Sequence, residues 1–405
     1  MHKIERLLHT LAPKGVEFRK LGEVCDFQKG KSITKKAVTF GKVPVISGGR
    51  QPAYYHNEAN RSGETIAISS SGVYAGYVSY WDIPVFLADS FSVSPKQKTL
   101  MPKYLFHYLT TQQDVIHATK STGGIPHVYS KDLQNFLIPI PPLEIQQEIV
   151  KILDAFTELN TELNTELKAR KKQYEYYQNM LLDFNDINLN HKDAKMNAKT
   201  YPKRLKTLLQ TLAPKGVEFR KLGEVLEYDQ PNQYCVTSKE FDKSYPTPVL
   251  TAGKTFILGY TNEKDNIYQA SKNAPVIIFD DFTTATQWVD FPFKVKSSAM
   301  KILFSKNPII NIRFIFFYMQ TIPYNIGGEH ARHWISRYSQ LEVPIPPLEI
   351  QQEIVKILDQ FSLLTTDLLA GIPAEIKARK KQYEYYREKL LTFKPLTPNK
   401  EVKKC

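Results

Sequence analysis

The sequence has few cysteines, no long apolar run and no nucleotide-binding glycine loop. Its 405 residues include three cysteines, Cys25, Cys235 and Cys405, which lack metal-ligand spacing and cannot all pair with one another. Such usage is typical of a reduced, cytoplasmic protein. The most apolar run, residues 309–322, is interrupted by polar residues and is too short to cross a bilayer. We therefore expect a soluble protein with no signal peptide and no membrane segment.

Signatures of catalysis are missing as well. Gly30-Lys31-Ser32 lacks the glycine five positions earlier that a phosphate-binding loop requires. His330 and His333 are three residues apart, but no cysteine or further histidine stands nearby to complete a zinc site. The acidic residues between positions 280 and 290 fit no two-metal arrangement and have no equivalent in the first half. We expect a non-catalytic chain that holds no metal and no cofactor.

Positive charge and aromatic residues are plentiful. Lys and Arg number 54 against 41 Asp and Glu, which gives a formal net charge of +13, and 12% of the residues are aromatic. Lysine and arginine neutralise phosphates, and aromatic faces stack on bases, so this composition favours a nucleic-acid partner. The alternative reading of the same charge is general solubility.

The chain contains long internal repeats. Ile138-Pro-Ile-Pro-Pro-Leu-Glu-Ile-Gln-Gln-Glu-Ile-Val-Lys-Ile-Leu-Asp154 returns almost unchanged as residues 343–359, and residues 11–24 return as 212–225. Duplication at so long a period indicates two repeated domains rather than a solenoid. Paired prolines suit the first turn of a helix but not its interior, so each copy predicts a strand end followed by a helix.

Apolar residues continue at helical spacing behind each of these helix starts, which predicts a seam for a partner helix. The obvious partner is the other copy, and an ordinary buried core helix is the alternative. The predicted seam residues are Ile149, Ile152, Phe156, Leu163, Leu167, Tyr174 and Leu181 in the first copy, and Ile354, Ile357, Phe361, Leu368, Ile376, Tyr383 and Leu390 in the second.

Between these helices the pattern predicts mixed α/β (α+β) domains. Short apolar runs separated by Gly, Ser and Asn predict strands at 43–46, 65–68, 77–80 and 84–87, and a helix is expected at 103–117. Residues 1–15 and 205–216 are each expected to form a short helix. The predicted organisation is a first domain at 1–142, a spacer helix at 143–185, a linker at 186–204, a second domain at 205–347, a second spacer helix at 348–393 and a charged tail at 394–405.

The tetrapeptide run Thr157-Glu-Leu-Asn, Thr161-Glu-Leu-Asn, Thr165-Glu-Leu, together with the duplicated proline-to-helix motif, resembles the specificity subunits of type I restriction-modification systems. The resemblance covers essentially the whole chain. It implies two target-recognition domains, one per half of a split double-stranded DNA target, joined by an antiparallel coiled coil of the two spacer helices. It also implies two methyltransferase subunits and, for cleavage, two restriction subunits as partners, which would carry out adenine methylation and DNA cleavage.

Each tetrapeptide lengthens a helix by about 6 Å, so the spacers are expected to set the gap between half-sites. Phe156 and Ala169 are 13 positions apart, whereas Phe361 and Ala378 are 17 apart, a difference of one tetrapeptide. Gly371-Ile-Pro373 is expected to break or kink the second spacer helix.

Recognition of DNA bases is expected from loops in which the two domains differ. Residues 69–76 and 280–287 are an example, because they occupy equivalent positions in the two repeats and have different side chains. The candidate DNA-binding residues of the first domain are Lys29, Lys31, Arg50, Tyr54, Tyr55, Ser70, Tyr74, Lys120 and His127. Those of the second are Lys254, Tyr260, Asp281, Thr283, Thr284, Gln287, His330, Arg332 and His333.

Two other functions fit the sequence. A sequence-nonspecific architectural DNA-binding protein would show affinity that follows salt but not sequence. A self-contained nuclease would cleave DNA with a metal and would lose that activity when Asp280 or Asp281 is replaced.

Overall fold

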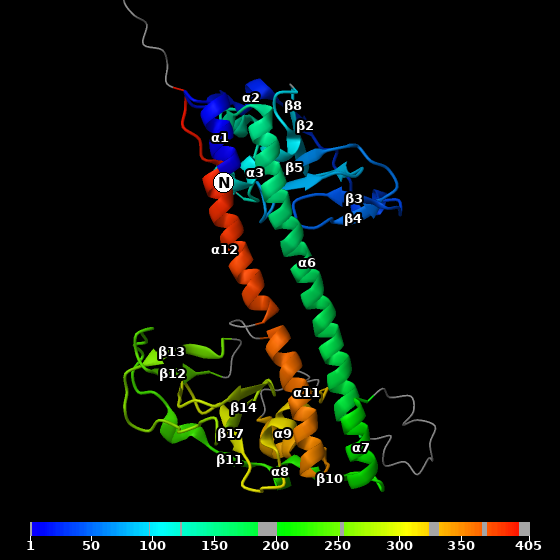
Figure 1. Cartoon of the computed structure of the whole chain (residues 1–405), viewed down its shortest axis with the longest axis vertical. Coiled ribbons are helices and arrows are strands. Elements are labelled where there is room, and N and C mark those ends of the chain that lie inside the picture. The colour runs from blue at the N-terminus through cyan, green and yellow to red at the C-terminus, as the bar shows by residue number, and fades with distance from the viewer. Residues whose placement is uncertain are drawn as a thin grey trace, which may run out of the picture. The chain divides into compact units, whose positions relative to one another are not determined.

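The computed structural model describes residues 2–96, 98–121, 124–184, 201–251, 255–323, 332–366 and 371–396. The chain divides into two compact units (Figure 1). Unit 1 comprises Met1–Thr165 and Glu375–Cys405, and unit 2 comprises Glu166–Ala374. Seam residue Leu368 and the candidates Lys254 and His330 lie outside the described residues.

The strands of unit 1 form three sheets in the described residues. An antiparallel sheet has the order β2-β8-β5-β6, a second has the order β4-β3-β7, and β1 pairs with β9. The strands are β1 (Glu17–Lys20), β2 (Cys25–Lys29), β3 (Val43–Ile46), β4 (Tyr54–His56), β5 (Thr65–Ser69), β6 (Val78–Trp81), β7 (Phe86–Leu87), β8 (Ser90–Pro95) and β9 (Leu137–Ile140).

Unit 2 repeats this topology in its described part. Its sheets have the orders β11-β17-β14-β15, β13-β12-β16 and β10-β18. The strands are β10 (Glu218–Lys221), β11 (Glu227–Asp229), β12 (Thr247–Leu250), β13 (Ile257–Thr261), β14 (Val276–Asp280), β15 (Thr286–Val289), β16 (Lys294–Val295), β17 (Met300–Phe304) and β18 (Glu342–Ile345). The register is repeated too, since Ile66 faces Val93 as Ile277 faces Leu303. The predicted duplication is confirmed.

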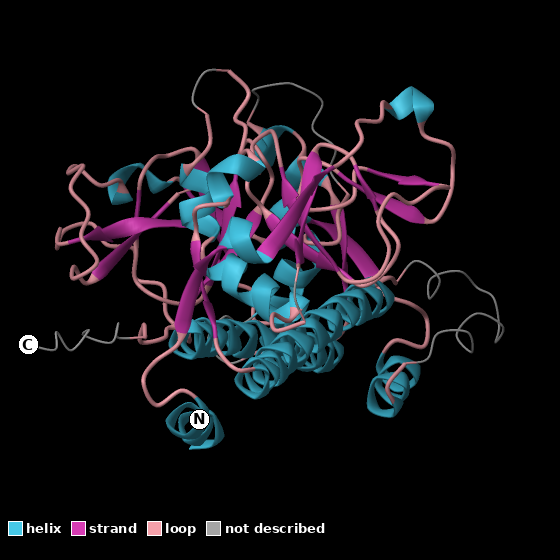
Figure 2. Cartoon of the chain, turned by 90° about the horizontal axis from the view of Figure 1, so that it is seen from above, coloured by secondary structure: helices cyan, strands magenta, loops and turns pink. Residues whose placement is uncertain are grey.

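The helices surround these sheets. Those of unit 1 are α1 (His2–Leu11), α2 (Leu21–Val24), η1 (Lys35–Ala37), α3 (Pro102–Thr111), α4 (Gln113–Ala118) and α5 (Ser130–Leu133). Those of unit 2 are α7 (Lys203–Leu212), α8 (Leu222–Val225), η2 (Pro231–Tyr234), α9 (Ile312–Met319), α10 (His333–Ser336), η3 (Tyr338–Gln340) and α11 (Leu348–Thr366). Residues of α6 (Leu143–Leu182) and α12 (Ile372–Leu391) belong to both units. Figure 2 shows the helices in cyan and the strands in magenta.

The strand predictions agree closely with the structure, but the helix expected at 103–117 is two helices. α3 ends at Thr111 and α4 begins at Gln113. Thr110 donates a side-chain hydrogen bond to the carbonyl of His107 at 2.7 Å, and Thr111 does so to Tyr108 at 2.6 Å. Such local bonds compete with the backbone hydrogen bonds of a helix and explain the interruption.

The first helix of each unit also ends earlier than the sequence suggested. α1 stops at Leu11, and the chain then turns at Gly15, whose φ is +107°. A Cβ at Gly15 would lie 2.6 Å from the carbonyl oxygen of Pro395, so only glycine fits. Gly216, with a φ of +102°, follows α7 in the same way.

Long helices pack against each other through aromatic residues inside each unit. In unit 1 the ring of Phe156 on α6 stacks on Tyr386 of α12, with ring centroids 5.5 Å apart. In unit 2 the ring of Tyr177 on α6 stacks on Phe361 of α11 at 5.1 Å. In both units the paired segments run antiparallel (Figure 1). Every predicted seam residue among the described residues is buried or half-buried.

The second spacer consists of two helices. α11 ends at Thr366 and α12 begins at Ile372, with Pro373 in its first turn, where the missing N–H costs little. The expected break at Gly371-Ile-Pro373 is observed, because Gly371 is described and is not helical. The described residues between 348 and 393 therefore do not form a single continuous helix.

Candidate nucleic-acid interface

The connection between β5 and β6 in unit 1 is held firmly in place. The backbone N–H of Gly76 donates to the carbonyl of Ser69 at 2.8 Å, and the side chain of Gln113 donates to the carbonyl of Gly76 at 2.7 Å. The hydroxyl of Ser69 donates to the carbonyl of Ser47 at 3.0 Å, which ties this connection to the β3–β4 turn. A rigid loop of this kind can present side chains without first being ordered.

The side chains on this loop and its neighbour combine positive charge with aromatic surface. The guanidinium carbon of Arg50 lies 4.9 Å from the ring centroid of Tyr74 and 5.7 Å from that of Tyr77. Tyr74 is 42% exposed and Val73 is 80% exposed. The stacking orients the planar guanidinium while its N–H groups stay available to a partner.

A third segment, residues 124–129, joins this surface. The N–H of Val128 donates to the carbonyl of Ser70 at 2.9 Å. The ring of His127 stacks on Tyr129 with centroids 6.0 Å apart. Nζ of Lys120 lies 2.9 Å from Nε2 of His117, whose Nδ1 lies 2.9 Å from the carbonyl oxygen of Ala75 in the β5–β6 connection. The structure thus brings together Arg50, Ser70, Tyr74 and His127 from separate parts of the sequence.

The remaining candidates of unit 1 lie on neighbouring elements. Lys29 ends β2 and Lys31 follows it, and both are exposed. The N–H of Lys31 donates to the carbonyl of Leu87 at 2.9 Å, close to where the β5–β6 connection begins. Tyr55 on β4 is 53% exposed, whereas Tyr54 is half-buried against the small core around Val45.

The corresponding connection of unit 2, between β14 and β15, is shaped by Asp280. Its carboxylate accepts the N–H of Phe282 at 2.9 Å and the hydroxyl of Thr283 at 2.6 Å. Thr284 adopts a positive φ of +58° inside this tight turn. Phe282 is 37% exposed and Thr283 is exposed, so this turn presents hydroxyl and aromatic groups where unit 1 presents tyrosine and arginine.

Two residues of unit 2 that the sequence predicted to bind DNA are buried in the structure. Asp281 is 1% exposed and His333 is 0% exposed, so neither side chain is presented to a DNA surface. Asp281 instead accepts the N–H of Trp334 at 2.9 Å, and its carboxylate lies 3.6 Å from Nζ of the buried Lys301. Its role is to hold the β14–β15 turn against α10.

The other described candidates of unit 2 remain accessible. Gln287 on β15 and Arg332, which precedes α10, are exposed, and Tyr260 on β13 and Thr284 are half-buried. The N–H of His333 donates to the carbonyl of Asp281 at 2.9 Å, so Arg332 is held next to the β14–β15 turn. The two units therefore build their candidate surfaces from equivalent connections and different side chains.

The sequence reasoning missed Tyr129, which is 48% exposed and extends the aromatic surface of unit 1. Nζ of Lys131 lies 5.4 Å from its ring centroid. The alternation His127-Val128-Tyr129, with the valine 1% exposed, is the pattern that could have identified it.

The candidate catalytic features have structural roles. Asp280 shapes a turn and Asp281 is buried, and the described residues hold no cluster of three or more His, Cys, Asp or Glu suited to a metal. Cys25 and Cys235 are both free, and burial raises the pKa of the Cys25 thiol to about 12, which makes it a poor nucleophile at neutral pH.

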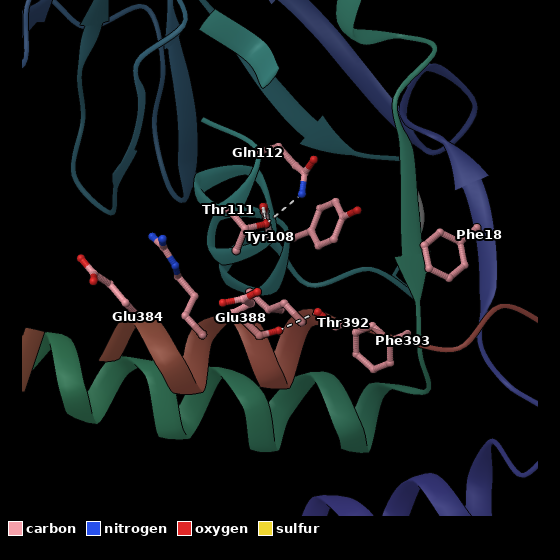
Figure 3. A pocket seen from close by; sticks show the side chains of 10 residues that line it. Phe18, Tyr108, Thr111, Gln112, Glu384, Glu388, Thr392 and Phe393 are labelled. Carbon is pink, nitrogen blue, oxygen red and sulfur yellow. Dashed lines mark hydrogen bonds between the residues drawn. The ribbon is translucent and has the colours of Figure 1, made fainter. Parts of the chain in front are cut away.

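A cavity of about 600 Å³ lies elsewhere in unit 1, between β1, α3 and the end of α12 (Figure 3). Glu384, Arg387 and Glu388 contribute its charged groups. None of the candidate DNA-binding residues lines it. No helix in the described part of the chain is long and apolar enough to cross a membrane.

These features define a class of protein: a duplicated α/β domain whose two copies share one scaffold and differ in their exposed loops. The family model for the type I restriction modification DNA specificity domain matches residues 13–172 and 214–378, and the chain belongs to that family.

Known proteins agree with this assignment. The EcoR124I/EcoR124II type I restriction enzyme specificity subunit of Escherichia coli is 54% identical over 188 residues, which cover 44% of this chain and 45% of that relative. A putative type I restriction enzyme specificity subunit of Haemophilus influenzae is 28% identical over 403 residues, covering 93% of this chain and 96% of the relative.

A solved structure shares the fold. The crystal structure of the type I restriction-modification system S subunit from M. genitalium matches with a TM-score of 0.64 and 19% identity, covering 93% of this chain and 96% of that chain. This likeness extends the fold assignment to both units and the helices that link them in sequence.

Proposed function

We propose that this chain is the DNA sequence-specificity subunit of a type I restriction-modification complex and that each unit binds one half of a bipartite DNA target. The observation that carries the proposal is the β5–β6 connection and its counterpart between β14 and β15, which hold the same place in two identical topologies and expose different side chains. Duplicated scaffolds explain binding to two sites, and different loops explain two different sequences.

Each unit offers the chemistry that base recognition requires. A stacked guanidinium such as that of Arg50 suits the O6 and N7 acceptors of guanine, while amide and hydroxyl groups such as those of Gln287 and Thr283 suit adenine and thymine edges. Exposed lysines such as Lys29 and Lys31 suit the phosphates.

The spacer helices would set the distance between half-sites. α6 continues through the tetrapeptide run, where the hydroxyl of Thr161 donates to the carbonyl of Thr157 at 2.8 Å and that of Thr165 to Thr161 at 2.9 Å. Each tetrapeptide therefore adds about 6 Å of helix. We infer that the antiparallel pairing of these helices forms a coiled coil, which the contacts of Phe156 with Tyr386 and of Tyr177 with Phe361 support.

Repeated surfaces on these helices support two identical protein partners. Tyr176 and Tyr385 are 59% and 58% exposed, and each is in edge contact with the tyrosine that follows it. Two copies of one surface suit two copies of one subunit. We assign these partners as two methyltransferase subunits, joined for cleavage by two restriction subunits, and we assign the chemistry to those chains.

An exchange of domains tests the proposal. Residues 16–140 would be replaced by the equivalent segment of another specificity subunit, and the recognised sequence would be determined for the complex. We expect one half-site to change while the other half-site and the gap stay the same. A change in both half-sites would contradict independent recognition, and binding that ignores sequence but follows salt would favour an architectural DNA-binding protein.

A further inference from the structure

Phe40 is the most exposed large apolar side chain among the described residues, at 93%. It lies in the connection between β2 and β3, after the short helix η1. A single exposed apolar residue is common on protein surfaces and needs no explanation by itself. The residues around Phe40, however, indicate that its exposure serves binding.

The residues on either side of Phe40 are fixed. The backbone N and O of Thr39 both lie 3.1 Å from Nδ1 of His56, a side chain that is 7% exposed and in edge contact with Phe86. A Cβ at Gly41 would lie 2.2 Å from the carbonyl oxygen of His56, so the backbone is packed there too closely for any other residue. Phe40 thus projects from an anchored base.

The segment around Phe40 is strongly basic. Residues 29–42 contain five lysines and no acidic residue. Lys35, Lys36 and Lys42 are exposed, and none of them forms an ion pair with another described residue. Positive charge on both sides of an exposed phenylalanine suits a partner that offers phosphates next to an apolar stack, which is the chemistry of duplex DNA.

The equivalent connection of unit 2 lacks this arrangement. Its phenylalanine, Phe241, is half-buried and packs on Gly259, where an added Cβ would lie 2.7 Å from the Cβ of Phe241. Nζ of Lys296 lies 5.5 Å from the same ring. The acidic residues Glu240 and Asp242 flank Phe241 in the sequence. The feature is therefore specific to unit 1.

We propose that Phe40 is an intercalating wedge that enters between two adjacent base pairs and kinks the DNA bound by unit 1. The proposal rests on the function proposed above. Phe40 and Arg50 lie at opposite ends of the hairpin of β3 and β4.

The test uses the full chain, without methyltransferase, bound to duplexes that carry its split target and a single 2-aminopurine at successive positions. We expect fluorescence to rise several-fold at one step on the unit 1 side and a bend to appear by energy transfer between the duplex ends. Phe40→Ala should abolish both, and Phe40→Leu should retain both because leucine can also act as a wedge. Phe241→Ala is the matched control and should change neither.

The outcomes separate the wedge from the proposed function. Sequence-specific binding with neither a fluorescence rise nor a bend would overturn the wedge and leave the specificity function intact. A Phe40→Ala chain that keeps both the fluorescence rise and the bend would also overturn the wedge. If the unaltered chain showed no sequence-specific DNA binding, both the wedge and the proposed specificity function would be overturned.

Discussion

Gln146 and Gln351 make the same three hydrogen bonds in the two units. Each lies in the repeated proline-to-helix motif and is fully buried. The side-chain nitrogen of Gln146 donates to the carbonyls of Pro141 at 2.7 Å and Thr99 at 2.8 Å, and its oxygen accepts the N–H of Met101 at 2.9 Å. Gln351 bonds in the same way to the carbonyls of Pro346 and Ile309 and to the N–H of Asn311, at 2.7, 2.9 and 2.8 Å.

These glutamines join the start of each long helix to the segment before α3 or α9. Replacing Gln146 with alanine would leave several buried backbone groups unpaired, and we expect a loss of about 2–4 kcal/mol in the free energy of unfolding of unit 1. Denaturant unfolding measures this loss. The neighbouring Gln147 is exposed, so Gln147→Ala should have almost no effect. Equal losses in both variants would contradict the structural role of Gln146.

The pair of Glu263 and Lys294 makes unit 2 sensitive to acid. Lys294 is 3% exposed, and its Nζ lies 2.8 Å from the Glu263 carboxylate. Burial alone would raise the pKa of Glu263, but hydrogen bonds from Lys294, Ser238 and Thr237 outweigh this effect and lower the pKa to about 2. Folding therefore favours the ionised carboxylate. Its stabilisation is present above the ordinary value of 4.5 and is lost as the pH falls towards 2.

We expect Glu263→Gln to lower the stability of unit 2 by about 1.5–3 kcal/mol at pH 7. The difference from the unaltered chain should shrink as the pH falls from 4.5 towards 2, because the unaltered carboxylate becomes protonated there. Glu240→Gln, an exposed change in the same region, serves as the control. A difference that is constant over this pH range would show that Glu263 acts through something other than its charge.

The buried pair of Asp281 and Lys301 supports the candidate surface of unit 2. Removing one partner leaves an uncompensated buried charge, so Lys301→Met should cost about 3–5 kcal/mol in unfolding free energy. Adding Asp281→Asn to that variant should cost less than the sum of the two single changes, because the two residues interact. Lys296→Met, at an exposed lysine on the same part of the chain, is the control. Strict additivity would contradict the pairing.

Arg50 is expected to determine one base pair of the first half-site. Arg50→Lys keeps the charge but loses the planar fork that contacts guanine twice, so preference for one G·C pair should fall by about 1–3 kcal/mol, or about 5- to 150-fold. Competition binding with duplexes altered one pair at a time measures this. Gln287→Ala should alter only the second half-site. Uniform weakening across all sequences would show that Arg50 contacts phosphate instead.

The main strands and helices could be predicted because local sequence patterns determine them. The proline-to-helix motif predicted β9 and β18 followed by α6 and α11, and the apolar run at 43–46 gave β3 with its observed bounds. The recurrence of residues 11–24 as residues 212–225, an offset of 201 positions, then predicted the repeated topology.

The candidate surface was harder to predict, because exposure depends on contacts between distant residues. Asp281 and His333 look like typical surface residues in the sequence, but both are buried. Asp281 accepts the N–H of Trp334 and lies 3.6 Å from Nζ of Lys301. Phe40 looks like a core residue but is 93% exposed, next to Gly41, whose backbone packs closely against His56. Neither relationship leaves a local pattern in the sequence.

Mapping of methylated adenines tests the central claim most directly. The chain would be co-expressed with its candidate methyltransferase subunit, and methylation would be mapped across the host genome. We expect a split motif in which two short defined sequences flank a gap of constant length, and deletion of residues 161–164 should change only that gap. Methylation without a split motif, or a deletion that changes the defined sequences, would contradict the account of two DNA-reading units separated by helical spacers.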